Sequence, residues 1–270
     1  MTKIPLVVII GGGFGGLAAA KELKNSPLNV LLIDRSNHHV FQPLLYQVAT
    51  SVLAPGQIAS PIRALLAAQT NTSVMLGNVT GISTASKQVI VDANDKIGLK
   101  ISYDYLIIAT GATHSYFGHD EFAAFAPGLK NLSDAESLRD HILEAFEKAE
   151  IEDDQDRQRE LMTFVLVGAG PTGVEMASAI AVMARTTLCK DFRRIDPRSA
   201  YIVLAEMGSR PLASAGGNFR GIRKRKAASA RDLPPVDVSK AEARRDDLEH
   251  VCVGAATGDR ACRAISPSPP

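Results

Sequence analysis

The chain has 270 residues, which is long enough for one large domain or for two domains of ordinary size. Its 30 basic and 29 acidic residues leave a formal net charge of +1, so the overall charge gives no argument for a nucleic-acid partner. The three cysteines have no metal-ligand spacing, exclude a disulfide scaffold and fit a reducing compartment. No apolar run reaches the roughly 18 residues that a membrane-spanning helix needs, and the glycines within residues 5–20 argue against a signal peptide there.

A glycine-rich turn between a predicted strand and a predicted helix is the first motif of the chain. The apolar run Leu6–Ile10 predicts the strand, glycines follow at Gly11, Gly13 and Gly16, and the alanine-rich run Leu17–Leu23 predicts the helix. In such a G-x-G-x-x-G loop the first glycine allows the tight turn, the second lets backbone N–H groups approach a pyrophosphate, and the third permits close packing of helix on strand. The sequence therefore predicts a dinucleotide site.

An acidic residue after the next strand supports this prediction. Asn29–Ile33 predicts a second strand, and Asp34 follows it directly. An acid at this place hydrogen-bonds the ribose hydroxyls of a dinucleotide in Rossmann folds. Strand, glycine loop, helix, strand and acid together carry far more weight than the glycines alone.

The same pattern returns in the second half of the chain. Met162–Val167 predicts a strand, Val174–Ala184 predicts a helix, and Glu206 ends a further predicted strand, Tyr201–Ala205. The glycines at the motif positions between the first strand and the helix are Gly168, Gly170 and Gly173. The acid lies further beyond the last glycine than is usual, because residues 185–198 extend the helix and add a charged loop. Two such units predict an α/β protein with two Rossmann-like domains.

The region between the two units predicts short strands and one long helix. The strands are Val74–Leu76, Val79–Ile82, Gln88–Asp92 and Tyr103–Ala109, with a hairpin tip at Asn94–Gly98 between the last two. Ser133 is predicted as the N-cap of a helix that runs to about Glu150, with Glu136 completing a capping box. The charged stretch from Glu150 to Glu160 is predicted to be a solvated helix end or linker at a domain boundary.

Two dinucleotide sites in one chain indicate electron transfer between two cofactors, because a nicotinamide donates hydride and a flavin accepts it. By order of appearance the first site is assigned to FAD and the second to NADH. The predicted organisation is an FAD-binding domain over residues 1–156, the first part of an NADH-binding domain over 157–212, and a tail over 213–270.

Several stretches resemble the two-dinucleotide-domain flavoprotein reductases of the pyridine nucleotide-disulfide oxidoreductase type, namely GGGFGG, YDYLIIATGA and VGAGPTGVE. Within that group, NHHVFQPLLYQVAT, ATGATHSYFGHDEF and APGLKNLSDA resemble type II NADH dehydrogenases, and the similarity covers about residues 4–212. The resemblance implies that NADH reduces FAD and that FADH2 reduces a membrane quinone without proton pumping. It also implies a cytoplasmic enzyme peripheral to the inner face of the cell membrane, and it leaves a homodimer open.

The resemblance also implies roles for residues around the first loop. The FAD pyrophosphate is expected on Gly11, Gly13, Phe14, Gly15 and Gly16, the adenosine ribose on Asp34, and the flavin near Thr110, Gly111, Pro43, Leu44 and Gln47. The family usually has Glu where Asp34 stands, so the expected ribose contact is shorter. Gln47 is a candidate catalytic residue, and an amide that bonds local backbone is the open alternative.

In the second unit, Gly168, Gly170 and Gly173 are expected to hold NADH, and Glu206 to accept the ribose hydroxyls and repel a 2′-phosphate. Glu175 resembles the acid that the family places near the nicotinamide and is the second catalytic candidate, with a solvated helix-start carboxylate as its alternative. No metal site is predicted, because His38 and His39 lack a third ligand at metal spacing; packing at the surface or at the flavin loop is expected for them instead.

The tail over residues 213–270 departs from the family. Phe, Ile, Leu and Val make up less than about a fifth of it, which predicts a disordered segment, and an out-of-frame ending of a longer gene is our hypothesis for it. The alternatives for the chain as a whole are an NADH-dependent reductase of a ferredoxin or rubredoxin and a truncated, non-catalytic remnant. Residues 1–188 contain no cysteine, which argues against thiol–disulfide chemistry beside the flavin.

Overall fold

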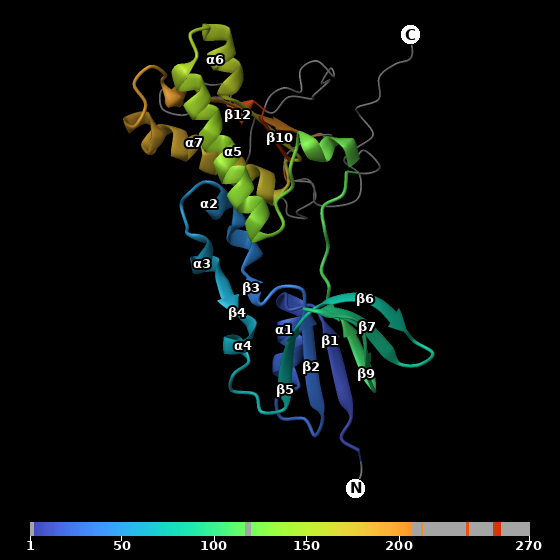
Figure 1. The fold of residues 1–270 in the computed structure, drawn as a ribbon. Helices are drawn as coiled ribbons and strands as arrows, with labels where there is room; N and C mark the ends of the chain where they lie inside the picture. The colour runs from blue at the N-terminus through green and yellow to red at the C-terminus, as the bar shows by residue number, and fades with distance from the viewer. Residues whose placement is uncertain (1–2, 117–119, 207–211, 213–235, 238–250, 255–270) are drawn as a thin grey trace, which may run out of the picture. The chain divides into compact units, whose positions relative to one another are not determined.

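The computed structural model describes residues 3–116, 120–206, 212, 236–237 and 251–254 (Figure 1). The chain divides into two compact units. The first unit comprises residues 1–41 and 56–113, and the second unit comprises residues 42–55 and 114–270. Each unit has its own parallel β-sheet, so the predicted α/β class with two Rossmann-like sheets is confirmed. The predicted domain boundary between residues 156 and 157 falls within the second unit and stays a prediction.

The sheet of the first unit has four parallel strands in the order β5-β2-β1-β9. These strands are β1 (Leu6–Ile10), β2 (Asn29–Asp34), β5 (Thr72–Leu76) and β9 (Tyr105–Ile108). Ile10, at the end of β1, pairs with Ile33 on one side and Ile108 on the other. Because all four strands are parallel, their carboxyl ends meet at one edge of the sheet, where ligands bind in open α/β sheets.

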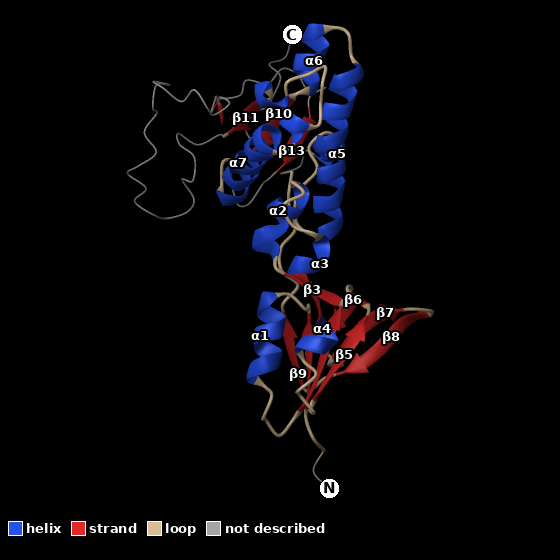
Figure 2. Ribbon diagram, turned by 90° about the vertical axis from the view of Figure 1, so that its left-hand side faces the viewer, coloured by secondary structure: helices blue, strands red, loops and turns tan. Residues whose placement is uncertain are grey.

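The central strand β1 is covered on both faces, which is why it is apolar throughout. On one face, Val7 and Ile9 pack with Leu17 of helix α1 (Phe14–Glu22). On the opposite face, Val8 and Ile10 pack with Val89 and Val91 of β7. This strand belongs to the antiparallel sheet β6-β7-β8, which lies beside the parallel sheet in Figure 2. The alternation of side chains along β1 therefore places it between a helix and a second sheet.

The antiparallel sheet consists of β6 (Asn78–Ser83), β7 (Gln88–Ala93) and β8 (Lys96–Ser102). The hairpin tip is narrower than predicted, because β8 begins at Lys96 and the turn is centred on Asn94, whose φ is +50°. Sequence reasoning did not predict β8 as a strand. Lys96, Gly98 and Lys100 interrupt its apolar pattern, and most of its residues are exposed.

The segment that follows β2 forms short pieces, in keeping with its prolines. They are β3 (His38–Val40), η1 (Gln42–Leu44), α2 (Leu45–Ala49), α3 (Pro55–Ile58), β4 (Ala59–Pro61) and α4 (Ile62–Leu65). In the first unit, β3 pairs with β4 in antiparallel fashion. Buried Ile62 of α4 packs into the same cluster as Val7 and Ile9.

The second unit is built on β10 (Thr163–Val167) and β11 (Tyr201–Ala205), which pair in parallel. The short strands β12 (Val236–Asp237) and β13 (Val251–Gly254) extend this sheet to the order β12-β11-β10-β13, again in parallel. These two strands were not predicted, because the tail has no sustained apolar period. The remaining residues of 213–270 lie outside the described part of the chain.

Two long helices supply the core of the second unit, α5 (Leu132–Ile151) and α7 (Pro171–Thr186). The ring of Phe146 on α5 lies 5.3 Å from that of Phe164 on β10, and both side chains are fully buried. The predicted N-cap of α5 is wrong. The cap is Asn131, whose side chain accepts a hydrogen bond from the Asp134 N–H, while the Asp134 carboxylate accepts from the Asn131 N–H. The capping box is thus shifted by two positions, because Asn caps as well as Ser and Asp takes the place of Glu.

The remaining short elements are η2 (Asp120–Ala124), α6 (Gln155–Leu161), η3 (Leu188–Lys190) and η4 (Pro197–Ser199). Helix α6 occupies most of the stretch predicted as a solvated helix end or linker, and Asp154 caps it by accepting from the N–H groups of Asp156 and Arg157. That stretch is therefore a folded part of the second unit. Within the described residues, no helix combines the length and the hydropathy that crossing a bilayer requires.

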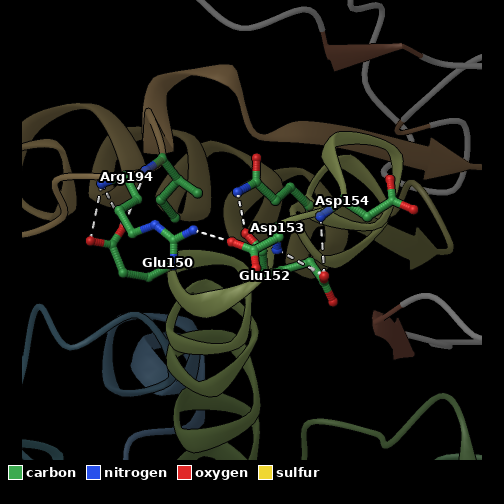
Figure 3. A network of polar contacts seen from close by, with 7 residues as sticks. Glu150, Glu152, Asp153, Asp154 and Arg194 are labelled. Carbon is green, nitrogen blue, oxygen red and sulfur yellow. Dashed lines mark hydrogen bonds and ion pairs between the residues drawn. The ribbon is translucent and has the colours of Figure 1, made fainter.

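A carboxylate at the end of α5 holds the loop that leads to β11 (Figure 3). Glu150 accepts hydrogen bonds from the backbone N–H groups of Arg193, Arg194 and Ile195 at 3.0–3.1 Å. The Arg194 guanidinium also pairs with Asp153. Desolvation raises the pKa of Glu150, but the three backbone hydrogen bonds and the charge of Arg194 outweigh it, so the pKa lies below its ordinary value.

This shift predicts a pH-dependent contribution of Glu150 to stability. Because its pKa is lower in the folded state than in the unfolded state, the contribution is present above the ordinary pKa and is lost as the pH falls through the folded value. We expect Glu150→Gln to be less stable than the wild type at pH 7, and the difference to shrink between about pH 5 and pH 3. Denaturant unfolding of both proteins at several pH values measures this difference in the free energy of unfolding.

The matched control is Glu147→Gln, one turn earlier on the exposed side of α5. We expect it to match the stability of the wild type at pH 7, because the three backbone N–H groups are bound by Glu150. A Glu150→Gln difference that stays constant from pH 7 to pH 3 would contradict the account.

Candidate functional site

The first glycine loop joins β1 to α1 at the carboxyl edge of the first unit's sheet. Gly11 has a φ of +107°, a conformation that favours glycine, and its N–H donates to the Ile33 carbonyl at 2.8 Å. The Leu17 N–H donates to the Gly13 carbonyl at 3.0 Å and so closes the first turn of α1. The loop is thus fixed to the neighbouring strand at one end and to the helix at the other.

The three motif glycines have different steric roles. A Cβ on Gly16 would overlap the carbonyl oxygen of Gly11, and a Cβ on Gly11 would overlap the carbonyl oxygen of Ala109. These two glycines are required by packing within the protein. A Cβ on Gly13 would meet no atom within 4 Å. Gly13 therefore faces open space, as expected for the glycine whose backbone a ligand must approach.

The start of α1 supplies donors at this open side. Gly13 is the N-cap and makes no side-chain cap, so the first-turn N–H groups of Phe14, Gly15 and Gly16 have no intrahelical acceptor. Such groups carry partial positive charge and favour phosphate. The loop and helix start can therefore hold a pyrophosphate.

Asp34 has a role in the loop that the sequence did not predict. Its Oδ2 accepts a hydrogen bond from the Gly12 N–H, while its Oδ1 accepts from the N–H and the hydroxyl of Ser36 at 2.6 and 2.7 Å. A carboxylate has about four acceptor positions, so these contacts leave capacity for a ribose hydroxyl. Asp34 thus braces the glycine loop from the end of β2.

The turn after β9 lies beside the first loop. The Ala109 N–H donates to the Ile10 carbonyl at 2.8 Å, which brings Thr110 and Gly111 to the same sheet edge. Gly111 has a φ of +71°, and a Cβ there would meet no atom within 4 Å. The structure therefore brings this predicted pair together with the glycine loop.

The second loop repeats this geometry in the second unit. Gly168 has a φ of +99°, and its N–H donates to the Ala205 carbonyl at 2.8 Å. The Val174 N–H donates to the Gly170 carbonyl at 3.1 Å, and a Cβ on Gly173 would overlap the Gly168 carbonyl oxygen.

The acid of the second unit also repeats the first. Glu206 Oε2 accepts from the Ala169 N–H at 2.7 Å, the place that Gly12 takes in the first loop. Both predicted loops, with their acids, therefore have one shared architecture.

The remaining predicted site residues belong to the second unit but not to its glycine loop. Pro43, Leu44 and Gln47 belong to the second unit, so their place near a flavin stays a prediction. The Gln47 amide donates to the Tyr46 hydroxyl at 2.9 Å, a side-chain contact rather than the backbone contact of the alternative. Glu175 is exposed on α7, beyond the first turn of that helix.

Two specific contacts around the first loop were not predicted, one to Asp34 and one to the loop itself. Ser36 braces Asp34, and His39 Nδ1 lies 3.1 Å from the Gly12 carbonyl oxygen. The only signal for His39 was its place in the short segment after the acid, which gives no contact by itself. In the part of the chain that the structure describes, no three His, Cys, Asp or Glu side chains group closely enough to hold a metal ion.

The sequence model of the pyridine nucleotide-disulphide oxidoreductase family matches residues 5–228, more than half of the chain. The chain belongs to this family. Membership agrees with the two glycine loops at equivalent sheet edges. The match continues to residue 228, whereas the resemblance was expected to stop at residue 212.

Curated relatives refine the comparison. The type II NADH:quinone oxidoreductase Ndh of Mycobacterium tuberculosis is 50% identical over 215 residues, which cover 79% of this chain and 46% of the relative. The mitochondrial external alternative NAD(P)H-ubiquinone oxidoreductase B2 of Arabidopsis thaliana is 35% identical over 189 residues, which cover 66% of this chain and 32% of the relative. The predicted resemblance to type II NADH dehydrogenases is confirmed, and the chain spans less than half the length of these relatives.

A solved structure supports the fold. NDH2 from Plasmodium falciparum in complex with NADH matches with a TM-score of 0.72 at 24% identity, covering 78% of this chain and 44% of that chain. At this identity the likeness shows the fold alone. The α/β arrangement described above is thus shared with NDH2 from Plasmodium falciparum.

The steric roles of the motif glycines predict unequal effects of one added methyl group. Gly16→Ala is expected to destabilise the fold by about 3 kcal/mol, because the methyl group overlaps backbone. Gly13→Ala is expected to cost less than about 1 kcal/mol, mainly through a poorer helix cap. Denaturant unfolding of the two variants measures the difference, and equal losses would contradict the steric assignment.

Proposed function

We propose that this chain carries the FAD-binding and NADH-binding loops of an NADH:quinone oxidoreductase. The observation that carries the proposal is the repeated loop architecture, a glycine turn whose middle residue is bound to the acid after the second strand. Two such sites in one chain suit two dinucleotides. The 50% identity to a type II NADH:quinone oxidoreductase supports quinone, rather than a ferredoxin or rubredoxin, as the acceptor.

FAD is assigned to the first loop and NADH to the second. The first loop has the Thr110–Gly111 turn at the same sheet edge, and open space at Gly13 and Gly111 fits a ligand along this edge. In the second unit, the loop glycines would hold NADH, and Glu206 would accept its ribose hydroxyls. Bound FAD would supply the hydride acceptor and the electron donor of the reaction.

In this assignment, groups of the protein bind the two cofactors and orient them. The first-turn N–H groups of α1 would hold the pyrophosphate, and Asp34 would keep the loop in shape while accepting a ribose hydroxyl. Gln47 and Glu175 are proposed to act near the flavin and the nicotinamide, respectively. Pro43 and Leu44 would line the flavin side.

The domain division and the cellular setting complete the proposal. Residues 1–156 would form the FAD-binding segment and residues 157–212 the first part of the NADH-binding domain. The enzyme would act at the inner face of the cell membrane, where its quinone is dissolved, and two copies would pair as a homodimer. The name of the Mycobacterium tuberculosis relative supports the quinone.

A visible absorption spectrum of the purified chain tests the proposal directly. We expect added FAD to bind and NADH to bleach its absorbance under anaerobic conditions. Gly13→Asp should abolish FAD binding, because it caps α1 while placing a negative charge at the phosphate side. Gly170→Asp should leave FAD binding intact and abolish bleaching by NADH.

A folded wild-type chain that binds no FAD would contradict the proposed function and favour the non-catalytic remnant. FAD binding that persists in Gly13→Asp would contradict the assignment of the first loop. Thermal unfolding of each variant verifies that the fold is retained.

The charge of Glu206 predicts the choice between NADH and NADPH. Glu206→Gln keeps an oxygen for the Ala169 N–H but removes the charge that would repel a 2′-phosphate. We expect the ratio of NADH to NADPH affinity to fall roughly fivefold. Titration of the FAD-loaded chain with each nucleotide measures the ratio, and an unchanged ratio would overturn the assignment of Glu206.

A further inference from the structure

His39 makes a directed contact with the first glycine loop. It lies in β3, and its ring Nδ1 is 3.1 Å from the carbonyl oxygen of Gly12. A carbonyl oxygen only accepts, so this contact requires the proton to be on Nδ1. The imidazole is therefore the donor and the loop is the acceptor.

The contact fixes the orientation of one peptide group of the loop. The Gly12 carbonyl and the Gly13 N–H belong to the same planar, trans peptide unit, so they point in opposite directions. A Gly12 carbonyl held by His39 therefore turns the Gly13 N–H away from that ring. Gly13 is the residue at which an added Cβ meets no protein atom.

The preceding peptide group is held as well. The Gly12 N–H donates to Asp34, so Gly12 is bound on its N–H by the acid after β2 and on its carbonyl by the histidine of β3. Two consecutive peptide planes of the loop are thereby fixed by side chains from two different strands.

The second loop binds the equivalent N–H in the same way but the equivalent carbonyl by a different donor. Ala169 donates its N–H to Glu206, while its carbonyl accepts from the Leu212 N–H at 2.7 Å. The same carbonyl is thus bound in both loops, by a side chain in the first and by main chain in the second. This recurrence indicates that the His39 contact meets a requirement of the loop.

The His39 ring is itself held in place. It meets the Phe14 ring edge-on, with centroids 4.9 Å apart and an interplanar angle of 90°, and Phe14 meets Phe41 at 5.5 Å. Pairing of His39 with Ser60 fixes its backbone in the β3-β4 ribbon. The donor is therefore directed at the loop by its ring contact and by its strand.

We infer that His39 is a positioning residue for the bound dinucleotide pyrophosphate: its Nδ1–H holds the Gly12 carbonyl so that the loop N–H groups stay arranged for phosphate. This inference rests on the proposed function, since the first loop is the one assigned to FAD. It makes His39 specific to the first site, because main chain holds the equivalent carbonyl of the second loop.

Three variants of the full chain test the role of His39. His39→Phe keeps a ring but removes the donor, and we expect its FAD dissociation constant to rise about fivefold. His39→Asn keeps an N–H donor in a similar place, so its FAD affinity should return to within about twofold of the wild type. His38→Phe is the matched control, because His38 contacts Asn37 rather than the loop. Flavin fluorescence titration measures each value.

Two further readouts separate positioning from general damage. NADH affinity should be unchanged in all three variants, because the second loop does not use His39. In the FAD-free protein, the Gly12 amide should exchange with solvent deuterium faster in His39→Phe than in the wild type and His38→Phe, since the loop is loosened.

Wild-type FAD affinity in His39→Phe, no recovery in His39→Asn, or a parallel loss of NADH affinity would each overturn the inference. A wild-type chain that binds no FAD would instead refute the proposed function. In that case the Gly12 exchange rates still decide whether His39 holds the loop.

Discussion

The hydrogen bond between the middle residue of each glycine loop and the acid after the second strand is the constraint on which both candidate sites depend. In the first unit it joins Gly12 to Asp34, and in the second it joins Ala169 to Glu206. It fixes the loop against the neighbouring strand and leaves the far side of the loop for a ligand. The acid thus shapes the site in addition to any contact with ribose.

This constraint works only because the strands are parallel and in register. Ile10 pairs with Ile33, and Val167 pairs with Ala205, so the end of each first strand lies level with the residue before the acid. A shift of the pairing by one position would turn each acid to the other face of the sheet. The apolar cores around Ile9 and Leu166 therefore position the two candidate sites at the sheet edges.

Much of this arrangement could be predicted from the sequence, because the loops depend on local patterns. Strand, glycine loop and helix are contiguous in each unit, and both of these units lie where the sequence predicted them. Each acid is further away, but it marks the end of the next predicted strand. Contacts made across longer distances could not be predicted in this way. His39 reaches Gly12 from 27 positions further along the chain, and no periodicity indicates such a contact.

The N-cap of α5 was placed at Ser133 because Ser and Glu fit the commonest capping box, whereas Asn131 and Asp134 form the same reciprocal bonds. The charged stretch after Glu150 was predicted as a solvated helix end or linker from its composition, and this composition gave no sign that Glu150 binds three backbone N–H groups of a loop that is distant in sequence.

The central claim is that one chain holds two dinucleotides at two separate loops. The most direct measurement is the binding stoichiometry, obtained by equilibrium dialysis with FAD and NAD⁺ together and separately. The account predicts one FAD and one NAD⁺ per chain, with neither displacing the other. Binding of one dinucleotide in total, or competition between the two for a single site, would contradict it.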